Sequence, residues 1–175
     1  MSYLIHTSII DSCPCRSLQN AAWDALSSEA DDSALVPNRV FKNMWVGGIR
    51  CAREAEKQEF QAIVNATSNL KYSTRLPAFR FVAWVPENGG WYKEQAAEIE
   101  SELDLLCRFV TAHDGCNILI HCKAGRHRAA TCCALLLCRL YDFSVNEAIA
   151  QVNSFRKCAD IYGKNRIFLD RFVVR

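Results

Sequence analysis

A cysteine and an arginine separated by five residues are the side chains best placed to do chemistry. The stretch reads His121-Cys122-Lys123-Ala124-Gly125-Arg126-His127-Arg128. A cysteine thiolate is a nucleophile, and a guanidinium can donate two parallel hydrogen bonds to the oxygens of a phosphate group. A loop of this length suffices to wrap around a tetrahedral oxyanion. The spacing therefore predicts that Cys122 is a nucleophile and that Arg128 binds the anion.

The residues on both sides predict how this loop is held. Residues 117–120 form an apolar run that indicates a short buried strand, and residues 129–138 are apolar on every side, which indicates a buried helix. A strand, a tight loop with Gly125 at its turn and a helix N-terminus together point backbone N–H groups at an anion. The same partial positive charge favours thiolate over thiol at Cys122. The predicted phosphate-binding residues are Lys123, Ala124, Gly125, Arg126, His127 and Arg128.

This stretch resembles the signature loop His-Cys-x5-Arg of the cysteine-based protein tyrosine phosphatase superfamily, and the chain size is most similar to its dual-specificity branch. The resemblance covers roughly residues 39–173. It implies a phosphatase that works through a cysteinyl-phosphate intermediate on Cys122, with His121 as a supporting residue that hydrogen-bonds within the loop. It also implies an α/β fold, in which a central, mostly parallel sheet carries helices on both faces. Strands alternating with helices along the chain favour the same architecture.

The family takes the proton for the leaving oxygen from an aspartate on a mobile loop ahead of the cysteine. Here no aspartate lies between Asp32 and Asp104. Glu87 lies in the expected turn, and its ordinary pKa is close to that of aspartate, so it is the predicted catalytic acid. Gly89 and Gly90 behind it would let the turn move. The alternative is that Glu87 is a solvated turn residue and that the acid is absent or comes from elsewhere.

The loop departs from the family directly after the arginine. The family has a serine or threonine there, whose hydroxyl helps the thiolate to leave the phospho-cysteine, whereas this sequence has Ala129. Thr131 follows two positions later and cannot be assumed to substitute for it. We therefore expect the turnover rate to be affected more than phosphate binding or attack.

Lys123 and Arg126 add two cations to the loop, and they leave the substrate class open. In this respect the loop resembles those of two phospholipid-directed branches, the tensin-homologue phosphoinositide phosphatases and the mitochondrial phosphatidylglycerophosphate phosphatases. Extra cations suit a substrate with several phosphates, although both side chains could instead face solvent or pair with neighbouring carboxylates. His127 could add donors at the floor or at the rim of the pocket.

Three functional classes follow from these residues. The first is a phosphatase acting on phosphotyrosine and on phosphoserine or phosphothreonine in proteins, which the branch size favours. The second is a phosphatase for phosphoinositides or another anionic phosphate, including lipid phosphates. The third is a weakly active or non-catalytic phosphate-binding module, suggested by Ala129 and the missing aspartate. The intact pair of Cys122 and Arg128 argues against the third class.

Composition limits the cellular setting and the partners. The chain has 175 residues and a net charge of +2, which suits one catalytic domain and gives no indication of nucleic acid binding. Its ten cysteines do not form metal-ligand pairs, so no metal or cofactor is expected. Cys132, Cys133 and Cys138 are expected to be packing residues of the apolar helix. That helix is too short to span a membrane, and without a visible secretory signal we expect a cytoplasmic or nuclear protein.

The rest of the chain predicts a domain of residues 39–175 behind an N-terminal arm or tail of residues 1–38. Residues 39–48 indicate a strand or hairpin, 62–67 and 79–85 indicate two further strands, and 52–60 favour a helix. Asn65, a position where the family commonly has asparagine, is interpreted as a capping or turn residue. Residues 93–110 form the strongest helical pattern. Its apolar face is made of Ile99, Leu103, Leu106 and Val110.

The C-terminal part predicts two closing helices. Ser144 and Glu147 fit a capping box, and the helix behind them is expected to bury Ala148, Val152 and Phe155. The spacing of Arg156, Asn165 and Phe168 is similar to that of the family's last helices. Arg156 is interpreted as a structural ion-pair residue and not as a substrate ligand.

Overall fold

The computed structural model describes residues 36–67, 70, 73–81 and 96–173. The chain divides into two compact units, Met1–Ala30 and Asp31–Arg175, and every described residue belongs to the second. The predicted arm therefore lies outside the described residues except for 36–38. The turn that carries Glu87 also lies outside them.

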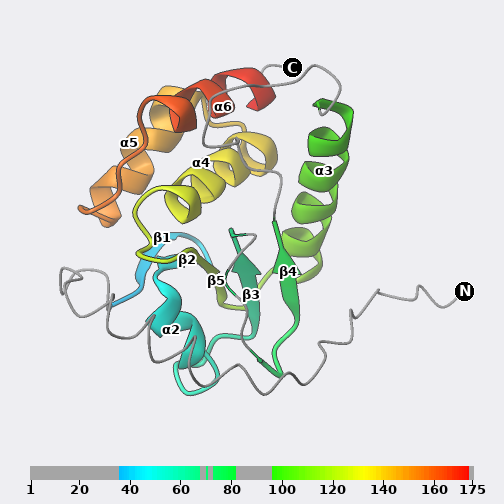
Figure 1. Ribbon diagram of the computed structural model, residues 1–175, viewed down its shortest axis with the longest axis vertical. Helices are drawn as coiled ribbons and strands as arrows, with labels where there is room; N and C mark the ends of the chain where they lie inside the picture. Colours follow the sequence, from blue (N-terminus) through cyan, green and yellow to red (C-terminus); the bar gives the residue numbers. More distant parts are fainter. Residues whose placement is uncertain (1–35, 68–69, 71–72, 82–95, 174–175) are drawn as a thin grey trace, which may run out of the picture. The chain divides into compact units, whose positions relative to one another are not determined.

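Five strands form one sheet in the order β1-β2-β5-β3-β4 (Figure 1). β1 and β2 form an antiparallel hairpin, and the other neighbouring strands are parallel. The central strand, β5, lies between β2 and β3, and all four of its residues are buried. The predicted mostly parallel sheet is confirmed, and of the two alternatives for residues 39–48, a strand or a hairpin, the hairpin is the one that forms. The strands are β1 (Asn38–Phe41), β2 (Met44–Gly47), β3 (Ala62–Asn65), β4 (Ala78–Arg80) and β5 (Ile118–His121).

Helices cover both faces of this sheet, as predicted (Figure 1). Ile118 and Ile120 of β5 point into the larger core, which four helices close, whereas Leu119 between them packs against Cys51 on the opposite face. This alternation is what a two-sided parallel sheet requires. The helix on the second face is α2 (Ile49–Arg53). The helices of the larger core are α3 (Ala96–Ala112), α4 (Arg128–Tyr141), α5 (Val145–Phe155) and α6 (Lys164–Val173).

Amphipathic periodicity places most of the helices correctly. The predicted apolar face of α3 is its buried face, and the capping box at Ser144 is present, with the hydroxyl accepting a hydrogen bond from the Glu147 N–H. All ten residues from 129 to 138 in α4 are buried. Burial raises the pKa of the Cys133 thiol to about 12 and that of Cys138 to about 11, which suits packing residues.

Two predictions about helices are wrong. The helix expected over 52–60 begins at Ile49 and ends at Arg53, followed by turns. Glu59 has a φ of 60°, which no right-handed helix accommodates. Phe155 is 52% exposed, because the buried repeat of α5 runs through Ala148 and Val152 to Arg156 instead.

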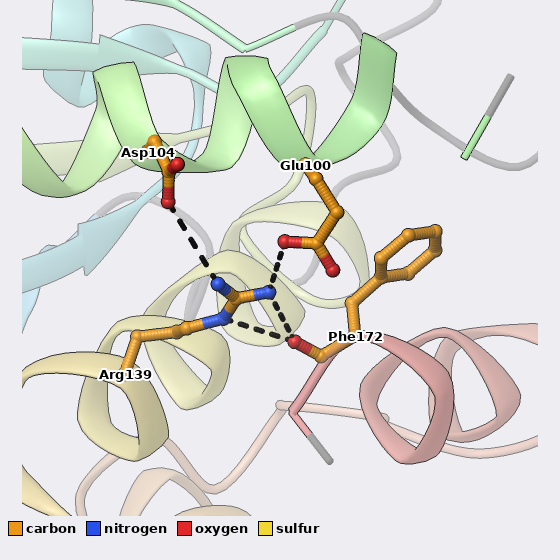
Figure 2. Close-up of polar contacts among 4 residues, drawn as sticks. All are labelled: Glu100, Asp104, Arg139 and Phe172. Carbon is orange, nitrogen blue, oxygen red and sulfur yellow. Dashed lines mark hydrogen bonds and ion pairs between the residues drawn. The ribbon is translucent and has the colours of Figure 1, made fainter. Parts of the chain in front are cut away.

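Arg139 fixes the far end of α4 to two neighbouring helices (Figure 2). Its Nη2 donates to the Glu100 carboxylate of α3 at 2.6 Å, and its Nε donates to the Phe172 carbonyl of α6 at 2.9 Å. Asp104 lies 3.9 Å from its Nη1. These contacts hold α4 near its C-terminus, while the first turn of α4 carries Arg128.

Within the described ranges, no helix combines the length and the apolar character needed to cross a membrane. The same residues contain no group of three or more histidine, cysteine, aspartate or glutamate side chains arranged to hold a metal ion.

Candidate active site

The Cys122 loop begins where three parallel strands end. Gly47 of β2 and Asn65 of β3 are the pairing partners of His121 on either side of β5, and Cys122 is the next residue. Ligand sites in open α/β sheets lie at this carboxyl edge. Asn65 organises the turn after β3, since its Oδ1 accepts from Thr67 at 2.7 Å and its Nδ2 donates to the Leu70 carbonyl at 2.9 Å. These contacts agree with the turn interpretation.

The Cys122 sulfur lies inside the loop. The residue is only 4% exposed, and the backbone N–H of Gly125 donates to its Sγ at 3.2 Å. Gly125 has a φ of +69°, a conformation that suits glycine. A backbone donor aimed at the sulfur stabilises negative charge on that atom.

The five carbonyl groups between Cys122 and Arg128 all accept hydrogen bonds from groups outside the loop or from the helix behind it. Because the peptide unit is planar and trans, the N–H that follows each carbonyl points the opposite way. The loop amides are thereby directed toward its interior, and the bond from Gly125 to the Cys122 sulfur agrees with this. Such an array of amides is an anion-binding nest. The bonds are Ile49 N–H to Lys123 O (3.0 Å), Arg156 Nη2 to Ala124 O (3.3 Å), Arg156 Nε to Gly125 O (2.7 Å), Asp160 N–H to Arg126 O (2.9 Å) and Thr131 N–H to His127 O (2.8 Å).

Arg128 is the first residue of α4 and is partly buried. Its guanidinium makes no hydrogen bond or ion pair with another residue of the described part of the chain. The residue directly follows the loop, and a planar guanidinium can donate two parallel hydrogen bonds to a phosphate group.

His121 is fully buried, and burial lowers its pKa to about 4. The imidazole is therefore uncharged at neutral pH. Its Nδ1 lies 3.4 Å from the Cys122 carbonyl oxygen, a contact of the kind expected for a supporting residue.

Arg126 and His127 contact the segment that follows α5. Arg126 Nε donates to the Cys158 carbonyl at 3.3 Å, and His127 Nε2 lies 3.3 Å from the Asp160 carboxylate. Both side chains remain exposed, as does that of Lys123. The sequence analysis did not anticipate Asp160, because a single aspartate after a helix carries no distinguishing local pattern.

The position after Arg128 offers no hydroxyl. Ala129 is fully buried, and the Thr131 hydroxyl donates to the His127 carbonyl at 2.9 Å. A threonine bonded in this way to the carbonyl four residues earlier has already used its single donor. Thr131 thus does not replace the missing group in this arrangement.

The prediction for Arg156 is partly wrong. The residue is structural and fully buried, but the partners that described residues supply are carbonyl and amide oxygens, and none of them is a carboxylate. Two of these oxygens belong to the Cys122 loop. The signal that could have revealed this is the arginine at the third position of a buried repeat, after Ala148 and Val152.

The family described as "Dual specificity phosphatase, catalytic domain" matches residues 45–166, so the chain belongs to the dual-specificity phosphatase family, whose members are hydrolases of phosphoric monoesters. Human dual specificity protein phosphatase 16 is 25% identical over 126 residues, which are 69% of this chain and 18% of that protein. The chain therefore spans less than a fifth of that relative's length.

Solved structures share the fold at low sequence identity. Human DUSP28 is 20% identical with a TM-score of 0.60, and the match covers 78% of this chain and 91% of that one. PTPMT1 in complex with PI(5)P is 19% identical with a TM-score of 0.60, covering 78% of this chain and 94% of that one. These likenesses support the predicted fold of the dual-specificity phosphatases.

Proposed function

We propose that this chain is a phosphatase that hydrolyses phosphomonoesters through a cysteinyl-phosphate intermediate on Cys122, and that its substrates are proteins phosphorylated on tyrosine, serine or threonine. The observation that carries the proposal is the geometry of the Cys122 loop, which we call the phosphate loop (residues 122–128). Its five carbonyls are held outward, and the Gly125 N–H donates to the Cys122 sulfur. A nucleophile at the floor of an amide nest is suited to a phosphoryl group with three equatorial oxygens.

In the first step the Cys122 thiolate attacks phosphorus. An S–P bond forms, the ester P–O bond breaks, and the leaving oxygen takes a proton. The loop amides and the Arg128 guanidinium hold the equatorial oxygens while charge redistributes. We assign the proton to Glu87, which lies outside the described residues.

In the second step water attacks the phospho-cysteine. The S–P bond breaks, the Cys122 thiolate leaves, and inorganic phosphate is released, so the cycle consumes one water for each ester. The carboxyl group that donated its proton in the first step can accept the proton of this water. The side chain of Ala129, directly after Arg128, has no donor for the departing thiolate.

Protein substrates rank first because two basic side chains of the loop already contact other residues of the chain. Arg126 and His127 each have a partner in the segment after α5. A phosphoinositide or other anionic phosphate is the second candidate. It is supported by the exposed side chains of Lys123 and Arg126, and PTPMT1, which shares the fold, has been solved with PI(5)P.

A weakly active or non-catalytic phosphate-binding module is the third candidate. It is supported by the buried Ala129 and by the Thr131 hydroxyl that is bonded within α4. The Cys122 thiol argues against it, because a module that only binds phosphate needs no nucleophile.

The decisive substitution is Cys122→Ser. We expect hydrolysis of an aryl phosphate to be abolished while inorganic phosphate still binds, because the loop amides and Arg128 remain. Cys116→Ser is the control, since Cys116 is also a free thiol but is only partly buried and lies before β5 and not after it. Full activity of Cys122→Ser would refute the cysteinyl-phosphate mechanism.

A substrate panel separates the candidate classes with the same preparation. Phosphopeptides, phosphoinositide vesicles and an aryl phosphate are compared by kcat/KM. Preference for phosphopeptides supports the first candidate, and preference for phosphoinositides supports the second. Phosphate binding without turnover of any substrate supports the third.

A further inference from the structure

Arg156 joins the phosphate loop to the start of β1. On the loop side, its Nε donates to the Gly125 carbonyl at 2.7 Å and its Nη2 donates to the Ala124 carbonyl at 3.3 Å. On the other side, its Nη1 donates to Asn38 Oδ1 at 2.6 Å and to the Val36 carbonyl at 3.0 Å. The residue has no exposed surface, so all three nitrogens of the guanidinium are held in place.

These bonds control two of the peptide groups that face the anion. With the Ala124 carbonyl directed at Arg156, the Gly125 N–H points inward, where it meets the Cys122 sulfur. With the Gly125 carbonyl directed at Arg156, the Arg126 N–H points inward as well. Glycine tolerates several backbone conformations, so the sequence of the loop does not by itself fix these orientations. A partner outside the loop has to fix them.

The fit at Gly125 indicates how closely Arg156 and the loop approach. A Cβ at this position would lie 2.7 Å from Arg156 Nη2 and 2.5 Å from the Gly47 carbonyl oxygen. Because the Gly47 oxygen is backbone, it cannot move aside cheaply. A residue without a side chain is therefore needed for the arginine to reach both carbonyls.

The charge of Arg156 lies behind the anion site. The oxygens that described residues offer to its guanidinium are three backbone carbonyls and one side-chain amide oxygen. None of these carries a formal charge that would neutralise the guanidinium. A cation held in a buried position beneath an oxyanion nest stabilises the bound anion.

We propose that Arg156 is a positioning residue for phosphate binding and transfer. It holds the Ala124 and Gly125 carbonyls outward, so that the Gly125 and Arg126 amides face the phosphoryl group, and it does so without touching the substrate. The proposal deepens the phosphatase function proposed above and rests on it for its catalytic consequence.

The test compares Arg156→Met with Arg139→Met. Both arginines anchor helices through backbone carbonyls, but Arg139 acts at the end of α4 that lies away from the loop. We measure kcat/KM for an aryl phosphate, the inhibition constant of orthovanadate and the melting temperature. Arg156→Met is expected to weaken vanadate inhibition and to lower kcat/KM by about 100-fold each, the scale of a lost oxyanion donor. Arg139→Met is expected to lower the melting temperature while changing both constants by less than about threefold.

Arg156→Lys covers the case in which the methionine variant does not fold. A lysine keeps the charge but presents one nitrogen instead of a fork, so we expect it to lose about tenfold in vanadate affinity, between wild type and Arg156→Met. A folded Arg156→Met or Arg156→Lys protein with wild-type constants would overturn the proposal. If the wild-type protein hydrolyses nothing but Arg156→Met still weakens vanadate binding, the positioning role stands and the phosphatase function fails. If Cys122 proves to be the nucleophile and Arg156 has no effect, only the positioning role fails.

Discussion

In the proposed mechanism, Ala129 is the residue that affects breakdown of the phospho-cysteine. The departing thiolate gains negative charge, and the position after Arg128 supplies a methyl group where a hydroxyl would stabilise that charge. The Thr131 hydroxyl donates to the His127 carbonyl, which leaves it without a second proton to offer. Attack on phosphorus, as proposed, uses the loop amides and Arg128, which are unaffected by this change. Breakdown of the intermediate is therefore expected to be the slow step.

Rapid mixing with an aryl phosphate tests this expectation. We expect a burst of product close to one equivalent of enzyme, followed by slow turnover. Ala129→Ser should speed the steady state by about 10²-fold and shrink the burst, because one donor at a site of developing charge is worth that much. Ala129→Gly, which adds no hydroxyl, is the control and should not speed turnover. A wild-type enzyme without a burst would mean that transfer to Cys122 is slow, which would point to a weak acid at Glu87.

At the scale of elements, the start of α5 provides a stabilising contact separate from the site. The Ser144 hydroxyl accepts from the Glu147 N–H at 3.3 Å, and the Ser144 N–H donates to the Glu147 carboxylate at 2.9 Å. The Ser144 hydroxyl also donates to the Glu147 carboxylate at 2.6 Å. This hydrogen bond, together with the one from the Ser144 N–H, lowers the pKa of the Glu147 carboxyl. The phosphate loop contacts the chain beyond the opposite end of this helix, at Arg156 and Asp160.

Ser144→Ala should therefore reduce stability and leave catalysis unchanged. Loss of a serine N-cap costs about 1 kcal/mol, measured as the free energy of unfolding in urea, while kcat/KM should stay at the wild-type value. Ser154→Ala is the matched control in the same helix. Its exposed hydroxyl donates only to the Ala150 carbonyl, so its effect should remain within about 0.5 kcal/mol. Equal losses in both variants would show that the capping box contributes nothing.

The elements that the sequence predicted well are those whose evidence is local. The apolar face of α3 repeats with the helical period, and the buried run of β5 is continuous, so neither depends on distant residues. The short α2 was misplaced, because charged residues with helical propensity continue past Arg53, while Glu59 adopts a left-handed backbone conformation. Propensity does not reveal where tertiary structure stops a helix.

In the candidate site too, residues that are close in sequence could be predicted and contacts between distant residues could not. Cys122, Arg128 and the loop between them are contiguous, so spacing alone could assemble them. Arg156 donates to Gly125, 31 residues earlier in the chain, and to Val36, 120 residues earlier. No local pattern encodes such contacts, and Phe155 was predicted to fill the buried position that Arg156 occupies. The outward orientation of the loop carbonyls depends on these distant partners, and therefore it could not be predicted from the sequence.

At the scale of the whole folded chain, His121 couples stability to pH. It is the last residue of the central strand, it has no exposed surface, and burial lowers its pKa from 6.5 to about 4. Between these two values the unfolded chain binds a proton that the folded chain does not. The contribution of His121 to the free energy of unfolding is therefore fully present above about pH 6.5 and is lost as the pH falls toward 4.

The free energy of unfolding should accordingly decrease by about 2 kcal/mol between pH 7 and pH 5, since a tenfold difference in proton affinity between the folded and unfolded chains corresponds to about 1.4 kcal/mol. The Glu147 carboxyl has a pKa lowered from 4.5, so its contribution is lost only below that pH and is constant in this range. Urea unfolding of wild type and of His121→Gln measures the difference, because the variant lacks the titrating imidazole and its stability should change little over the same interval.

His113→Gln is the control, since His113 is only partly buried just after α3 and bonds to the Phe109 carbonyl. This variant should keep the wild-type slope of unfolding free energy against pH. If wild type shows no loss of stability between pH 7 and pH 5, or if His121→Gln retains the full slope, then His121 is not the residue that makes folding sensitive to acid, and its imidazole must be able to take up a proton inside the folded chain.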